Sequence, residues 1–214
     1  MSGGALDPFY PVLPGAAWAA RIASQGAKFI QLRVKDMPPL AVKTEIARAL
    51  ELRSHGCQLV VNDYWRWAID LGAGFVHLGQ GDLVGADIAA IKVAGIRLGI
   101  STHSLGELDI ALGVEPDYIA LGPIYETKLK TMPWAPQGLD RIGQWRAKID
   151  CPLVAIGGIT LERAPDVLAA GASSAAVVTD IVMSEDPEQR TRQWIAATDP
   201  WRNLSTGRPQ SCPP

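Results

Sequence analysis

Residues 58–63 read QLVVND, a short apolar run that ends abruptly in an amide and a carboxylate. Such a run, rich in branched residues, is typical of a strand that is buried on both faces of a parallel sheet. Similar runs recur along the chain, at residues 9–14, 29–33, 75–79, 96–101, 118–124, 152–158 and 174–180. The stretches between them have helical spacing, as at Val42, Ile46 and Ala49. Alternating strands and helices in this number predict a single-domain α/β fold, a (β/α)₈ TIM barrel. The alternative, a doubly wound open sheet, would leave some of the units unused.

The composition is that of a globular protein, with 48% hydrophobic and 20% charged residues in a chain of 214. We place the barrel at residues 8–198, between a flexible N-terminus at 1–7 and a proline-rich polar tail at 199–214. The formal net charge of −2 gives no reason to expect a nucleic-acid or membrane partner. The three cysteines are scattered and match no metal-binding spacing, and no secretion signal is recognised, so we expect a cytoplasmic protein. Homo-oligomerisation stays open, because periodicity does not distinguish exposed helix faces from interface faces.

Polar residues follow the predicted strands, and in a barrel the carboxyl ends of all strands meet on one face. Asp63 and Asp82 follow neighbouring strands, which lie about 4.8 Å apart. Two carboxylates without histidine or cysteine beside them suit a hard cation, so we expect them to bind Mg²⁺. The alternative is that each aspartate only caps the helix that follows it.

Basic side chains accompany these carboxylates on the same face. Arg33 and Lys35 share the side-chain direction of one strand, and Lys130 comes from another loop. Together with a bound Mg²⁺ they predict a diphosphate site, although solvated surface charge is an alternative reading of each cation alone.

A second anion site is predicted where the last two strands end, at residues 155–160 (AIGGIT) and 177–180 (VVTD). Loops after these strands of a barrel often bind phosphate through backbone N–H groups, although a tight turn would explain the glycine pair equally well. A diphosphate clamp opposite a monophosphate cradle indicates a transferase that expels a diphosphate leaving group. Of the histidines, His55 and His77 are interpreted as structural, and His103 as a candidate for a supporting role on the active face.

These motifs, in this order, resemble those of thiamine phosphate synthase, over about residues 8 to 197. The resemblance is carried by QLRVKD (31–36), VNDYWRWAI (61–69), FVHLGQGDL (75–83), LGISTH (98–103), YIALGPIYET (118–127), APQGL (135–139) and VAIGGITLERAP (154–165). It implies a (β/α)₈ enzyme of thiamine biosynthesis that requires Mg²⁺. Such an enzyme joins 4-amino-2-methyl-5-(diphosphomethyl)pyrimidine to 4-methyl-5-(2-phosphooxyethyl)thiazole, and it releases thiamine phosphate and pyrophosphate. The displacement in this family is dissociative, because the pyrimidine–diphosphate bond ionises before the thiazole nitrogen attacks.

The resemblance also implies roles for individual residues. Asp63 and Asp82 correspond to the Mg²⁺ ligands, and the catalytic groups at the diphosphate correspond to Arg33, Lys35, Ser101 and Lys130. The implied substrate-binding residues are Gln31, Leu32, Arg33, Val34, Lys35, Asn62, Ser101, Thr127, Lys128, Leu129, Lys130, Gly158, Val178 and Thr179. Among these, Gly158, Val178 and Thr179 fall where the family binds the thiazole phosphate.

One loop departs from the family pattern, Pro-Thr-x-Thr-Lys, because residues 126–130 read ETKLK. The proline is lost, and Leu129 replaces a threonine whose hydroxyl helps to bind phosphate. Two alternatives therefore stay open: a thiazole tautomerase-like barrel, in which a Glu-Thr pair resembling Glu126-Thr127 follows strand six, and a non-catalytic protein that binds thiamine precursors. Pro123 stands where the tautomerase has its histidine acid/base, which favours the synthase.

Overall fold

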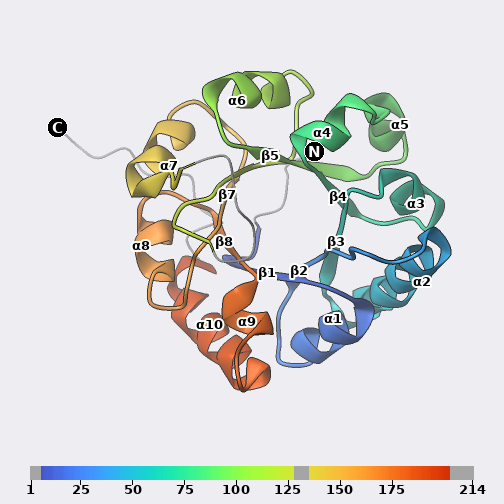
Figure 1. The fold of residues 1–214 in the computed structure, drawn as a ribbon, viewed down its shortest axis with the longest axis horizontal. Coiled ribbons are helices and arrows are strands. Elements are labelled where there is room, and N and C mark those ends of the chain that lie inside the picture. Colours follow the sequence, from blue (N-terminus) through green and yellow to red (C-terminus); the bar gives the residue numbers. More distant parts are fainter. Residues whose placement is uncertain (1–5, 128–134, 203–214) are drawn as a thin grey trace.

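The computed structural model describes residues 6–127 and 135–202, and these form a closed barrel of eight parallel strands surrounded by helices (Figure 1). The strands are β1 (Phe9–Leu13), β2 (Phe29–Leu32), β3 (Gln58–Asn62), β4 (Phe75–Leu78), β5 (Arg97–Thr102), β6 (Tyr118–Leu121), β7 (Leu153–Ile156) and β8 (Ser174–Val177). Each strand pairs with its neighbours in sequence, and β1 closes the barrel against β8 with Phe9 opposite Ala175. The predicted (β/α)₈ fold is confirmed.

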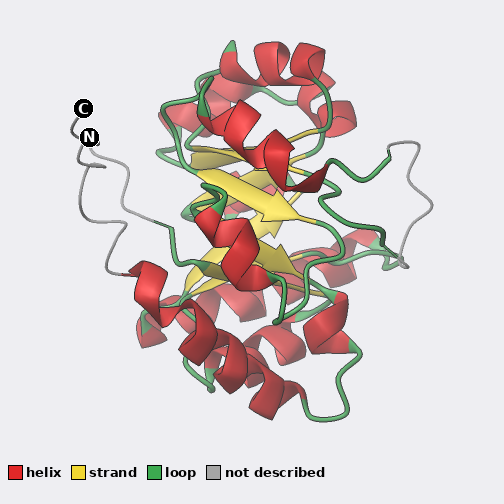
Figure 2. Ribbon diagram, turned by 90° about the vertical axis from the view of Figure 1, so that its left-hand side faces the viewer, coloured by secondary structure: helices red, strands yellow, loops and turns green. Residues whose placement is uncertain are grey.

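The helices lie outside the barrel, and the strands run in one direction, so that their carboxyl ends meet at one end (Figure 2). The α-helices are α1 (Ala16–Ala23), α2 (Pro39–Leu50), α3 (Trp65–Asp70), α4 (Gln80–Val84), α5 (Ile88–Val93), α6 (Leu105–Leu112), α7 (Gly138–Arg146), α8 (Ala164–Ala169), α9 (Thr179–Val182) and α10 (Pro187–Arg202). A short 3₁₀ helix, Glu51–His55, follows α2. Within the described parts of the chain, no helix is both long and apolar enough to cross a membrane.

Two apolar clusters follow from the alternation of side chains along each strand. The larger one fills the space between the strands and the helices, and the smaller one fills the barrel interior with aromatic rings. In the interior, the Tyr10 and Phe29 rings stack with centroids 4.1 Å apart. Gly99 makes room for Tyr118, because a Cβ at Gly99 would lie 2.1 Å from the Tyr118 ring. The aromatic layer fills the barrel beneath its carboxyl-terminal end and provides a rigid floor there.

Both ends of the barrel differ from the predicted boundaries at residues 8 and 198. Leu6 is buried, and the Asp7 carboxylate pairs with Arg202, with Nε 2.9 Å from Oδ2. Helix α10 continues to Arg202, four residues beyond the predicted end of the barrel domain at 198. This ion pair ties the last turn of α10 to the segment that leads into β1, and the domain boundaries stay a prediction.

Candidate active site

The carboxyl ends of the strands surround a cavity of about 540 Å³. Nine of the residues predicted from the sequence line it: Gln31, Arg33, Lys35, Asn62, Ser101, Thr127, Gly158, Val178 and Thr179. Leu32 and Val34 do not; their side chains are buried in the cluster between strands and helices, as strand alternation requires. Lys128, Leu129 and Lys130 lie outside the described residues. The fold thus brings residues from six strand-end segments around one opening.

The two predicted metal ligands, Asp63 and Asp82, lie next to each other at the ends of β3 and β4. Asp63 directly follows β3 in a left-handed backbone conformation, with φ of 65°, and Asp82 belongs to the first turn of α4. Desolvation, followed by the charge of Asp63 and a hydrogen bond with it, raises the pKa of the Asp82 carboxyl. Neither residue occupies an N-cap position, which belongs to Tyr64 in α3 and to Gly79 in α4. The geometry therefore does not support an N-cap role for Asp63, whereas the Asp82 carboxylate accepts a hydrogen bond from the backbone N–H of Gly79, so for Asp82 the capping alternative stays open beside the metal-binding one.

A cation already neutralises part of this charge. The Lys35 ammonium lies 2.5 Å from Asp63 Oδ2, and Lys35 also lines the cavity. Arg33 lines the same wall, and the structure gives its guanidinium no ion pair with any residue in 6–127 or 135–202. Two cationic side chains thus line the cavity, and one of them, Lys35, joins it to the aspartate pair, so an anionic ligand would be attracted there.

The aspartate pair fits a Mg²⁺ ion that receives its other ligands from water and from substrate phosphates. The charge of Asp63 raises the cost of ionising the Asp82 carboxyl, and a shared divalent cation would relieve it. No group of three or more histidine, cysteine or acidic side chains suited to a metal occurs among the described residues. A fully protein-coordinated metal is therefore not found there, and the pair alone is the candidate.

A chain of buried polar groups forms the cavity floor, and the sequence prediction missed most of it. Gln31 Nε2 donates to the Tyr10 hydroxyl (2.9 Å), which lies 3.0 Å from that of Tyr118. The Tyr118 hydroxyl contacts His77 Nδ1 (2.8 Å), and His77 Nε2 contacts Ser101 Oγ (2.8 Å). Burial lowers the pKa of His77 to about 4, so the imidazole is neutral near pH 7. This series of hydrogen bonds therefore holds the Ser101 hydroxyl in place without adding charge.

His77 is a buried strand residue, as expected, and it also lines the cavity, as Tyr10 does. Tyr118 does not line the cavity, but its hydroxyl contacts both of them. Their inward direction could have been read from strand parity, since Tyr118 and Ala120 share one face of β6. His103 also lines the cavity, and the Glu107 carboxylate holds its Nδ1 at 2.8 Å. The supporting position predicted for His103 agrees with this contact.

The opposite wall of the cavity is made of backbone. Gly157 and Gly158 have φ of 101° and 65°, and a Cβ on Gly158 would lie 2.3 Å from the Glu126 carbonyl oxygen. Val178 and Thr179 lie at the start of α9, where the first N–H groups have no partners within the helix. We call residues 157–161 and 178–180 the anion cradle, because exposed N–H groups in such loops favour a phosphate.

Comparison with known proteins shows which family the chain is similar to. The sequence model of the family described as "Thiamine monophosphate synthase" matches residues 13–181. The chain belongs to this family. A thiamine-phosphate synthase of Rhizobium etli is 56% identical over 201 residues, covering 93% of this chain and 98% of the relative. That of Salmonella agona is 48% identical over 189 residues, covering 87% and 90%.

A solved structure has the same fold. Thiamine phosphate pyrophosphorylase from Pyrococcus furiosus superposes with a TM-score of 0.80, at 24% identity, over 91% of this chain and 96% of its own. Since its identity is low, this likeness supports the barrel architecture alone. Membership of the thiamine monophosphate synthase family rests on the family match and on the sequence relatives, and it makes this chain a transferase enzyme of thiamine biosynthesis.

Proposed function

We propose that the chain couples 4-amino-2-methyl-5-(diphosphomethyl)pyrimidine with 4-methyl-5-(2-phosphooxyethyl)thiazole, giving thiamine phosphate and pyrophosphate in the presence of Mg²⁺. The observation that carries this proposal is the division of the cavity into two anion-binding walls. Arg33, Lys35 and Ser101 line one side, where Lys35 pairs with Asp63, and the anion cradle stands on the other. A reaction between a diphosphate and a monophosphate needs both.

In the proposed reaction, the bond between the pyrimidine methylene carbon and the diphosphate oxygen breaks, and its electron pair leaves with pyrophosphate. The thiazole nitrogen then supplies the electron pair of the new C–N bond. A Mg²⁺ held by Asp63 and Asp82 would neutralise charge on the leaving diphosphate. Arg33 and Lys35 would bind the same oxygens, the Ser101 hydroxyl would donate to one of them, and Asn62 and Gln31 would orient the pyrimidine.

This scheme assigns charge stabilisation to the protein, and it needs no protein nucleophile. The described cavity lining contains no cysteine, and its histidine nearest to Ser101 is the buried, neutral His77. Pro123 lines the cavity at the place where the tautomerase alternative requires an acid/base histidine. The lining therefore supports displacement better than proton transfer.

The experiment that tests the function is pyrophosphate release by the purified protein with both phosphorylated precursors, first with Mg²⁺ and then with excess EDTA. We expect release only when both substrates and the metal are present, and loss of release with EDTA that excess Mg²⁺ restores. Isomerisation of the thiazole phosphate without the pyrimidine would instead support the tautomerase. Binding of both precursors without release would support the non-catalytic protein.

Arg33→Ala is expected to weaken binding of the pyrimidine diphosphate by about 2 kcal/mol, the scale of a hydrogen bond to a charged group. This loss corresponds to roughly a thirtyfold increase in Kd. The effect is expected because Arg33 lines the cavity and pairs with no carboxylate among the described residues. Isothermal titration with the diphosphate substrate, in the absence of the thiazole, measures it. Arg48→Ala is the control, since Arg48 is exposed on α2 away from the cavity. Equal affinities of the Arg33 variant and the wild type would remove Arg33 from the diphosphate site.

A further inference from the structure

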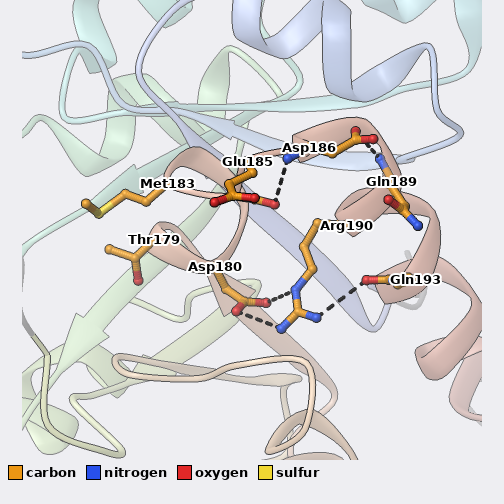
Figure 3. A pocket seen from close by; sticks show the side chains of 9 residues that line it. Thr179, Asp180, Met183, Glu185, Asp186, Gln189, Arg190 and Gln193 are labelled. Carbon is orange, nitrogen blue, oxygen red and sulfur yellow. Dashed lines mark hydrogen bonds and ion pairs between the residues drawn. The ribbon is translucent and has the colours of Figure 1, made fainter.

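A second polar pocket, of about 450 Å³, lies behind the anion cradle, between α9 and the start of α10. It is lined by Thr179, Asp180, Met183, Ser184, Glu185, Asp186, Gln189, Arg190 and Gln193 (Figure 3). Thr179 lines both this pocket and the active-site cavity. The two cavities are therefore separated by the segment of the cradle at the start of α9.

The wall of this pocket contains a dense set of hydrogen bonds centred on the Asp180 carboxylate. Arg190 from α10 reaches both of its oxygens, with Nε 2.9 Å from Oδ2 and Nη2 2.9 Å from Oδ1 (Figure 3). Trp194 Nε1 donates to Oδ2 at 2.7 Å, and the backbone N–H of Leu161 donates to the same oxygen at 3.2 Å. One carboxylate thus joins three separate segments of the chain.

Two of these segments are the two halves of the anion cradle. Leu161 ends the loop that contains Gly157 and Gly158, and Asp180 directly follows Val178 and Thr179. The third segment is α10, the longest helix of the described chain. The two halves follow the paired strands β7 and β8, and Asp180 adds a second link between them beyond the strand ends, because it accepts from Leu161 while Arg190 and Trp194 hold it.

The surroundings strengthen this arrangement. The Asp180 side chain is 13% exposed and that of Arg190 is 22% exposed, so water competes little for their bidentate contact. Arg190 Nη2 also pairs with Glu162 Oε1 at 3.0 Å, just beyond Leu161. Its guanidinium is occupied by carboxylates on the side away from the cavity, and it is not available to bind substrate itself.

We propose that Asp180 and Arg190 are positioning residues that set the affinity for the monophosphate substrate without touching it. The inference rests on the proposed function, because it takes residues 157–161 and 178–180 as the cradle of the thiazole phosphate. Backbone N–H groups bind an anion well only when their positions relative to one another are fixed before the anion binds. The Asp180–Arg190 pair, on the side of the cradle that faces the second pocket, holds the two halves of the cradle in those positions.

The protein contains a matched pair that makes the inference testable. Asp7 and Arg202 form the same bidentate contact, at 2.9 and 3.1 Å, and Asp7 also accepts from a backbone N–H, that of Phe9. This pair likewise joins α10 to the barrel, but it precedes β1, at the opposite end of the strands from the cavity. Its loss removes a similar anchor of the same helix and leaves the cradle untouched.

The experiment compares Asp180→Asn with Asp7→Asn by steady-state pyrophosphate release, varying each substrate in turn. In Asp180→Asn one of the two acceptor oxygens becomes an NH2 donor that faces other donors, so the link from Leu161 through residue 180 to α10 is weakened. We expect its KM for the thiazole phosphate to rise roughly tenfold or more, the scale of displacing binding groups by a fraction of an ångström. Its KM for the pyrimidine diphosphate is expected to stay within about twofold, which is the range of ordinary mutational scatter.

Asp7→Asn is expected to lower the melting temperature similarly and to change neither KM. Arg190→Lys is the second variant: it keeps the charge and loses the bidentate contact, and we expect a smaller rise in the same KM. Equal rises in both KM values, or a rise in Asp7→Asn as large as in Asp180→Asn, would overturn the positioning role. Absence of release by the wild-type protein would instead contradict the proposed function itself.

Discussion

Asp63→Asn is expected to lower kcat by about a thousandfold or more, which corresponds to roughly 4 kcal/mol of lost transition-state stabilisation. The substitution keeps the shape of the side chain and removes one of the two charges at the aspartate pair. Asparagine suits this position better than alanine, because Asp63 has a φ of 65° and asparagine is among the residues that tolerate left-handed backbone. Pyrophosphate release measures the loss, and an unchanged melting temperature shows that the fold persists.

A matched control for this variant lies on the protein surface. Asp70 at the end of α3 pairs with Lys43 at 3.2 Å, as Asp63 pairs with Lys35, but Asp70 is exposed and Lys43, unlike Lys35, does not line the cavity. We expect Asp70→Asn to retain full activity. Activity of Asp63→Asn above about a tenth of the wild-type value would be too high for loss of a metal ligand, and it would remove Asp63 from the metal site.

The strand positions could be predicted because each strand is buried on both faces and therefore appears as a nearly continuous apolar run. The site residues at the strand ends could be predicted from the same pattern. A polar residue at the end of a buried strand, such as Asn62, is expected to point into the opening of the barrel. Leu32 and Val34 show the limit of carrying over a contiguous motif, since the side chains of QLRVK alternate between the cavity and the core. Only Gln31, Arg33 and Lys35 direct their side chains into the cavity.

The sequence could not show which residues far apart along the chain are in contact in the fold. Tyr10 and Tyr118 are 108 positions apart, and their hydroxyls meet only because the closed barrel faces β1 toward β6 across its interior. Asp180 appears in the sequence as one more polar residue after a strand, and nothing there reveals that Leu161, Arg190 and Trp194 converge on it. The pair of Asp7 and Arg202, 195 positions apart, escaped prediction for the same reason.

Gly158→Ala is expected to disable the anion cradle. The left-handed backbone at Gly158, with φ of 65°, costs a residue with a Cβ about 1 kcal/mol or more. The larger effect is steric, because the new Cβ would lie 2.3 Å from the Glu126 carbonyl oxygen and 2.8 Å from Tyr125 Cβ. Both are parts of the loop after β6, so the cradle and this loop must move apart. We expect the KM for the thiazole phosphate to rise roughly a hundredfold, the scale of misplacing a binding group by about an ångström.

The backbone and steric parts of this effect can be separated within the same protein. Gly72 has a nearly identical φ of 63°, and a Cβ there would meet nothing within 4 Å. Gly72→Ala should therefore lose only about 1 kcal/mol of unfolding free energy and keep both KM values, because Gly72 follows α3 and lies outside the cavity lining. If Gly158→Ala loses no more stability than Gly72→Ala and binds the thiazole phosphate normally, the close approach of residues 125, 126 and 158 is not what shapes the monophosphate site.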